Sequence, residues 1–433
     1  MGSSKILHII LILAFEIGTS LRFELVGVLT LGWILALVYT CLFLWRSPLL
    51  KEKNFRTISL IYFAMIVFQI MADFMVDNTL TNGMKGAAVG IVSYANLFFL
   101  SSLICKNQKL TIWLFLGMAL ECLIKGVTGD YEGEDLAEEA MEGENASFLK
   151  FVLAPLLTYL MLCLSSFIRG TKATYIFMYF GVFLVLAGAR SSGLTAFLIG
   201  VTVWIVRFKK KNVTAFIRTY SLPILAVLYG VYAIYVTKVI SGELTTGNNQ
   251  QLAKSDNPYN PLEIIKYSRT DAWMGLVAWA DKPLWGHGSW PTDETHKYHI
   301  MMAEITGNKY VPRKEAPLVP GHSVIFGKAV CGGVFSMISV TMLIMFFVRR
   351  QYKLLNHDSR YTFINAYCLF STIWHSLFSP LGHIRDDFPQ MFAVTLALWL
   401  AYSKESQQQT ALPRKSHPQS PSRGKRYALP NGQ

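Results

Sequence analysis

The sequence predicts an all-α integral membrane protein with about twelve transmembrane helices and one large loop on the outer face of the membrane. Of its 433 residues, 52% are hydrophobic and only 15% are charged, a composition too apolar for an ordinary soluble protein. Apolar runs of about 17–25 residues, the length that spans a bilayer as a helix, recur along almost the whole chain. Lysines and arginines gather beside alternate short loops, as the positive-inside rule expects of a multi-pass protein.

The apolar runs define the predicted spans. They lie at residues 5–20, 24–45, 57–77, 86–104, 110–125, 149–168, 173–189, 192–207, 215–237, 323–348, 361–378 and 388–402. Residues 1–237 are therefore expected to form an N-terminal membrane bundle of about nine spans, and residues 322–402 a C-terminal set of about three. The first run follows Lys5 and ends in small residues, as a signal peptide does, but a retained helix is favoured because no small-x-small cleavage site is clear.

Basic residues give the expected orientation. They cluster at 46–56, 106–109, 169–172, 207–211 and 349–360, and these loops are expected on the cytoplasmic side together with both termini. The acidic stretch 130–144 and the large loop 238–321 then fall outside. The net charge of +13 belongs mostly to the inner face, so a nucleic-acid partner is not expected.

The C-terminal segment 403–433 is rich in Gln, Ser, Pro, Lys and Arg and has no apolar periodicity. Such a segment cannot bury enough apolar surface to fold alone, so it is predicted to be a disordered cytoplasmic tail.

The first of four polar places at the outer ends of the spans is the turn at 187–193. It leaves Arg190 at the outer membrane face, against the orientation rule. One interpretation is an interfacial arginine that reaches the lipid headgroups. The other is a fixed cation for a phosphate-bearing lipid, because a guanidinium presents a planar fork of donors that matches phosphate oxygens.

The second place is a helix predicted over 261–281, which begins after the cap Asn260 and ends before Pro283. Its inward face is otherwise apolar, and Arg269 interrupts that face, so the guanidinium is expected to point at the membrane domain. A simple ion pair with Asp271 or Glu263 is one hypothesis. The other is that Arg269 and Arg190 clamp one pyrophosphate between them.

The third place is Gly321-His322-Ser323, where the large loop re-enters the membrane. A histidine there titrates near neutral pH, as a general base requires, although a satisfied polar side chain is the simpler alternative. The fourth is the segment 377–380 with His383 and Arg385 after it, which forms either a polar cluster or an ordinary turn.

His287, His296 and His299 share one loop with Asp293 and Glu294, and all five side chains are of types that bind metal ions. Their spacing fits no strong metal signature, and an H-x-x-H pair on an irregular segment is weak support for one. No metal and no other cofactor is expected.

In their order and common outer side, these places resemble the O-antigen ligase and O-antigen polymerase superfamily of bacterial membrane glycosyltransferases. The resemblance covers roughly residues 170–400. It rests on the Arg-Ser-Ser-Gly turn at 190–193, on Ser268-Arg269-Thr270 leading into 282–288, and on Gly321-His322-Ser323 before a glycine-bearing helix. The spaced glycines that the ligase branch has after this histidine are replaced by Gly332, Gly333 and Ser336, while the 377–380 segment with its following arginine looks more like polymerase-type members.

The resemblance implies a donor glycan on undecaprenyl pyrophosphate, a pyrophosphate held by Arg190 and Arg269, and action of His322 at the acceptor hydroxyl. The implied protein is a metal-independent polymerase of O-antigen or other surface polysaccharide in the bacterial inner (cytoplasmic) membrane, with a periplasmic loop and membrane lipids around it. An O-antigen ligase that transfers glycan to the lipid A-core of lipopolysaccharide is the alternative within the same class. A lipid-linked glycan flippase is the alternative from another class, and the lack of two similar halves speaks against it.

Overall fold

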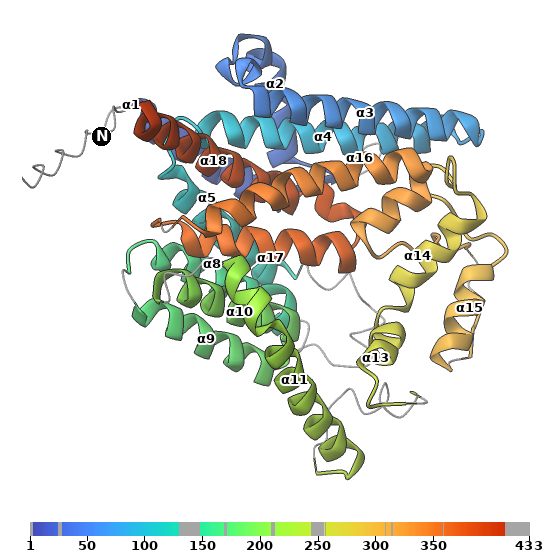
Figure 1. The fold of residues 1–433 in the computed structure, drawn as a ribbon. Coiled ribbons are helices and arrows are strands. Elements are labelled where there is room, and N and C mark those ends of the chain that lie inside the picture. Colours follow the sequence, from blue (N-terminus) through green and yellow to red (C-terminus); the bar gives the residue numbers. More distant parts are fainter. Residues whose placement is uncertain are drawn as a thin grey trace, which may run out of the picture.

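The computed structural model describes residues 3–24, 28–129, 148–168, 171–208, 213–243, 255, 257–307, 309–312, 315–357 and 359–411. Within these ranges the chain is almost entirely helical (Figure 1), and the sheet found there is one antiparallel hairpin of β1 (Arg22–Glu24) and β2 (Val28–Thr30). The all-α fold class is confirmed at this level. Four described helices are long and apolar enough to cross a membrane: α3 (Lys53–Met75), α4 (Leu80–Ile104), α5 (Leu110–Thr128) and α16 (Val324–Leu355).

The other predicted spans also coincide with helices. These are α1 (Ser3–Thr19), α2 (Leu31–Phe43), η3 (Leu149–Leu153) with α8 (Ala154–Ser165), α9 (Thr171–Leu186), α10 (Arg190–Phe208), α11 (Val213–Ile240), α17 (Thr362–Phe378) and α18 (Asp387–Ala411). Short 3-10 turns add η1 (Leu44–Arg46), η2 (Pro48–Lys51) and η4 (Leu381–Ile384). A long apolar run satisfies its backbone most simply as a helix, which is why the helix positions could be predicted.

Two predicted boundaries are wrong. The span predicted from residue 24 begins at Leu31, because the β1–β2 hairpin precedes it and Thr30 caps the helix by accepting a hydrogen bond from Trp33 N at 3.2 Å. The tail predicted to be disordered from residue 403 is helical as far as Ala411. Residues 403–411 are mostly good helix formers and contain no proline. The predictions for 412–433 and for the acidic stretch 130–144 concern residues outside the described ranges.

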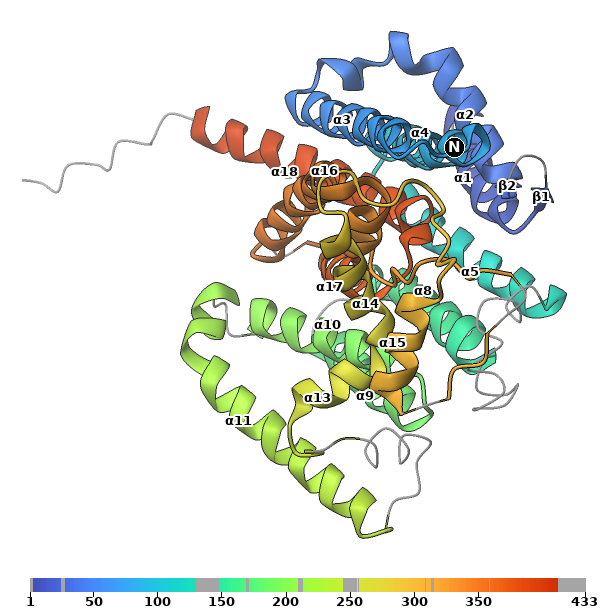
Figure 2. The same cartoon turned by 90° about the vertical axis from the view of Figure 1, so that its right-hand side faces the viewer.

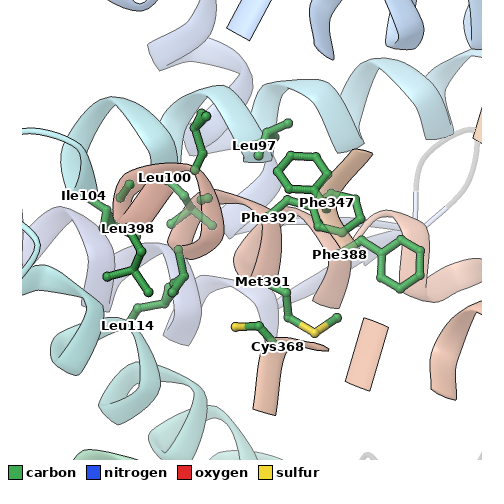
Figure 3. Close-up of a cluster of buried hydrophobic side chains, with 14 of the residues drawn as sticks. Leu97, Leu100, Ile104, Leu114, Phe347, Cys368, Phe388, Met391, Phe392 and Leu398 are labelled. Carbon is green, nitrogen blue, oxygen red and sulfur yellow. The ribbon is translucent and has the colours of Figure 1, made fainter. Parts of the chain in front are cut away.

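The largest buried cluster extends over α1 to α5, α8 to α10 and α16 to α18, and Figure 3 shows the part formed by α4, α5, α16, α17 and α18. Phe347 of α16 and Phe392 of α18 are both fully buried, and their rings stack with centroids 3.9 Å apart and planes at 5°. Close packing of this kind holds the three C-terminal helices in a fixed register. This packing therefore fixes the positions of the helix ends relative to one another.

Three further helices lie across one end of the bundle, as Figures 1 and 2 show together. They are α13 (Pro261–Ser268), α14 (Thr270–Asp281) and α15 (Lys297–Thr306). We call this end of the bundle the loop end. The helices α3 and α17 run toward it, whereas α4, α16 and α18 run away from it. At the opposite end, Arg207 Nη2, close to the C-terminus of α10, donates to the carbonyl of Ser359 at 3.2 Å, just before α17 begins.

Candidate functional site

Arg269 lies at a break between two helices. The single helix predicted over 261–281 is wrong, because Arg269 leaves helical geometry with φ −132° and ψ 38° and separates α13 from α14. At this break Thr270 Oγ1 donates back to the carbonyl of Tyr267 at 3.1 Å, a side-chain bond that competes with regular helix. The guanidinium carbon lies 5.7 Å from the ring centroid of Trp374 and 6.0 Å from that of Phe378, both on α17. Arg269 thus contacts the bundle, as predicted.

His322 lies beside a carboxylate at the same place. Its Nδ1 is 3.7 Å from Asp271 Oδ2, and Asp271 is the second residue of α14. The two meet because α14 packs closely on the chain that enters α16: a Cβ on Gly275 would lie only 3.3 Å from Gly321 Cα. A carboxylate beside an imidazole orients the ring and stabilises its protonated form. The sequence suggests Asp271 as an ion-pair partner of Arg269 and not of His322.

Ser323 joins the start of α16 to the end of α17. Its hydroxyl accepts from Phe326 N at 3.3 Å as the helix cap and donates to the carbonyl of Ser376 at 2.9 Å. The side chain is fully buried. This bond holds the entrance of α16 against the last turn of α17. As a result, Arg269, Asp271, His322, Trp374 and Phe378 share one rim, which we call the Arg269–His322 cluster.

The cluster is open to solvent. The side chain of His322 is 33% exposed and that of Asp271 is 42% exposed. A substrate hydroxyl is therefore able to reach the imidazole, which is the geometric requirement for a general base.

Arg190 is less closely associated with this cluster. It is the first residue of α10, follows Gly188 with its φ of +106°, and its side chain is exposed. The contact between Arg207 and Ser359 fixes the far end of α10, a whole helix away from Arg190. The contacts described above therefore join Arg269 and His322 to one rim, and Arg190 has no part in them.

Arg385 and His383 lie in the link between α17 and α18. The Arg385 guanidinium carbon is 4.6 Å from the ring centroid of Trp33, and its carbonyl accepts from Asn96 Nδ2 at 2.9 Å. His383 stacks on His375 of α17 with ring centroids 4.3 Å apart. Arg385 thus contacts α2 and α4, whereas His383 belongs with His375 to a polar group whose other members the sequence does not predict.

A buried polar network anchors the large loop to the bundle. Asp73 Oδ2 of α3 accepts from Ser289 Oγ at 2.7 Å, and Gln69 Nε2 donates to the same hydroxyl at 3.0 Å. Lys328 of α16, only 2% exposed, donates to Gln69 Oε1 at 3.2 Å. Ionisable residues within apolar helices are costly unless they are paired, so each must have a partner. Asp73 and Lys328 were visible in the sequence as isolated charges inside apolar runs, but their partners were not.

The loop also completes the backbone of a broken membrane helix. At Gly333 of α16 the backbone has φ 66° and ψ −163°. Val334 N donates to the carbonyl of Pro283 at 2.9 Å, and His287 N donates to the carbonyl of Val330 at 2.7 Å. Because backbone groups in a membrane must be satisfied within the protein, the segment 283–287 is required where α16 breaks.

The histidines of the large loop do not gather into one site. His287 Nε2 is 2.8 Å from the carbonyl of Ala278, and burial lowers the pKa of His287, which favours the neutral ring. His299 Nδ1 is 2.8 Å from Asp293 Oδ2. His296 is instead hydrogen-bonded to Tyr310. Each ring thus has a different partner.

Comparison with known proteins gives no family. No protein-family model matches the chain, and no curated protein matches it.

Proposed function

We propose that the protein is a metal-independent glycosyltransferase of the O-antigen polymerase type, which joins lipid-linked glycan units at the outer face of a bacterial inner membrane. One observation carries this proposal: a solvent-accessible His–Asp pair and an arginine held on aromatic rings share the rim formed by α16 and α17. In a glycosyl transfer, a base can take the proton of the attacking hydroxyl, and a nearby cation can stabilise the negative charge of the leaving phosphate group.

Arg269 is assigned to the pyrophosphate of the donor, undecaprenyl-pyrophosphate-linked glycan. Its guanidinium keeps a planar fork of donors, and the rings of Trp374 and Phe378 limit the directions in which that fork can point. Negative charge grows on the pyrophosphate as its bond to the sugar breaks, and a preorganised cation stabilises that charge. Arg190 is proposed as the second cation, because its exposed guanidinium offers the same fork of donors to a phosphate.

His322 is assigned as the general base. The acceptor hydroxyl oxygen attacks the anomeric carbon of the donor glycan, and the bond from that carbon to the pyrophosphate oxygen breaks. The hydroxyl proton passes to His322, and undecaprenyl pyrophosphate leaves with the bonding electrons. Because Nδ1 faces Asp271, Nε2 is the nitrogen assigned to the acceptor. The leaving group is a stable anion, so the transfer step needs no nucleotide and no metal ion.

The proposed topology has about twelve spans, both termini in the cytoplasm and the large loop in the periplasm. Five helix directions support it, because the predicted outward spans α3 and α17 run toward the loop end and the predicted inward spans α4, α16 and α18 run away from it. The acceptor is a second lipid-linked glycan. An O-antigen ligase, which uses lipid A-core as the acceptor, is the alternative that shares the same donor chemistry, and a flippase of lipid-linked glycan is the alternative without transfer.

Deletion of the gene separates the polymerase from the ligase by what accumulates. A strain without the polymerase is expected to carry lipid A-core with at most one repeat unit. Wild-type gene on a plasmid should restore long chains, and the His322→Gln gene should not. Long glycan stranded on undecaprenyl pyrophosphate would indicate the ligase instead. Unchanged surface glycan in the deletion strain would rule out both transferases.

A further inference from the structure

The link between α17 and α18 gathers three side chains of metal-ligating type at the loop end. They are His375 of α17, His383 of η4 and Asp387 at the start of α18, and one ligand atom from each lies within 4.8 Å of the others. The two imidazole rings stack with centroids 4.3 Å apart and planes at 21°. His383 Nδ1 is hydrogen-bonded to Asp387 Oδ2. We call these residues the His375–Asp387 cluster.

The local fold explains why these three meet. The helix α17 ends at Phe378, and Pro380 turns the chain into the short helix η4. His383 and Asp387 are four residues apart across the start of α18, so their side chains fall on one side of the link. The turn η4 brings them back onto the last helical turn of α17, where His375 lies.

The ring of His375 is already oriented by a neighbour. Its Nδ1 is hydrogen-bonded to Ser379 Oγ at 2.8 Å, so its Nε2 faces away from that hydroxyl. Metal-binding histidines typically use one nitrogen for the ion and fix the other by such a hydrogen bond. The His383–Asp387 bond shows that a carboxylate oxygen and an imidazole nitrogen come into direct reach of each other.

We propose that the His375–Asp387 cluster binds one divalent transition metal ion, with zinc as the best match. Two imidazole nitrogens and one carboxylate oxygen form a ligand set that zinc accepts, and a fourth position remains for water. Ligand atoms on a tetrahedral zinc ion lie about 3.3 Å apart, given metal–ligand bonds of about 2.0 Å. The observed limit of 4.8 Å exceeds this by an amount that side-chain rotation covers.

The ion has a structural role, separate from the proposed transfer step. It links the end of α17 to the start of α18. This link stabilises the C-terminal part of α17, where Trp374 packs against Arg269. This site was not predicted, since the sequence directs attention to the five His, Asp and Glu residues of the large loop.

The test is the metal content of the purified full-length protein in detergent, after loading with zinc and removal of unbound ion. Mass spectrometry of total metal is expected to find about one zinc per chain for the wild type, as a single site requires. His375→Ala and His383→Ala should lose it, because each removes a ligand. His299→Ala is the matched control, since His299 also pairs with an aspartate but lies in the large loop, and it should keep the zinc.

Ser379→Ala provides a second test that leaves all three proposed metal ligands in place. It removes only the hydrogen bond to His375 and is expected to weaken zinc binding by about 10–100-fold, measured by competition with a chromophoric chelator. Wild-type protein without bound zinc after loading, or equal zinc in the wild type and the His375→Ala variant, would overturn the proposal. Metal content is measured without any glycan donor, so failure here leaves the proposed transferase untouched, and the converse also holds.

Discussion

Replacement of Gly333 by alanine tests how the large loop is fixed to the membrane bundle. Gly333 has φ 66° and ψ −163°, a region that essentially only glycine occupies. A Cβ at this position would lie 2.1 Å from the carbonyl oxygen of Leu284, which is backbone and cannot rotate away. Gly333→Ala should therefore push the segment 283–287 off the break in α16.

The cost has two parts. Backbone strain in this region contributes about 1–3 kcal/mol, and forced overpacking contributes about 1–3 kcal/mol more. Gly307→Ala is the matched control, because Gly307 has the same φ of 66° but ψ 22° and open space around its Cα. A left-handed alanine there costs about 1–2 kcal/mol and displaces nothing.

Hydrogen exchange of the purified protein measures the difference. The amides of His287 and Val334, which bond Val330 and Pro283 across the break, should lose protection by about 30-fold or more in Gly333→Ala, since 2 kcal/mol corresponds to about that factor. Gly307→Ala should leave both amides protected. Equal protection in Gly333→Ala and the wild type would refute the claim that the loop completes the broken helix.

Three further predictions concern the site and its side of the membrane. Arg269→Lys should lower the transfer rate by about 10–100-fold, because lysine keeps the charge but loses a charge-assisted hydrogen bond worth about 1.5–3 kcal/mol. His322→Gln should lower the transfer rate by about 10²–10⁴-fold, because glutamine accepts no proton. Asp271→Asn should lower the rate by a smaller factor, because Asp271 only orients the ring of His322. In a chain without native cysteines, an impermeant thiol reagent applied to spheroplasts should label Thr295→Cys and spare Gln407→Cys, because both positions are exposed but lie on opposite predicted sides.

Controls keep these predictions informative. Arg46→Lys changes an exposed arginine at the opposite end of the bundle and should transfer normally, so a loss there would indicate a general defect. Full activity of Arg269→Lys would leave Arg269 as an ordinary interfacial cation. Rescue by His322→Gln would point to positioning and not to proton transfer. Reversed labelling would overturn the orientation and every role assigned at the loop end.

The helical framework was predictable because long apolar runs leave the backbone little alternative in a membrane. The wrong helix boundaries lie outside the long apolar runs, where this constraint on the backbone does not apply. The hairpin before α2 uses strand pairing between β1 and β2, and the break at Arg269 depends on a local side-chain bond from Thr270. The helix beyond residue 402 is made of polar helix formers, which a hydropathy pattern does not detect.

Single residues of the site could be predicted from the sequence, but their arrangement in space could not. Arg269 and His322 stand out because they are polar at the ends of apolar spans. The approach of Asp271 to His322 and the aromatic rings under Arg269 depend on how α14 packs on α16 and α17, which no local pattern specifies. The stack of His375 on His383 likewise depends on the turn between α17 and α18.

The central claim is tested most directly by glycan transfer with purified protein and a synthetic undecaprenyl-pyrophosphate-linked glycan, without nucleotide or added metal ion. The wild type is predicted to lengthen the glycan and to release one undecaprenyl pyrophosphate for each bond formed. Its single-turnover rate should rise with pH, because only the neutral imidazole of His322 accepts the proton. Correctly folded wild-type protein that releases no undecaprenyl pyrophosphate, or that transfers at the same rate as His322→Gln, would contradict the account.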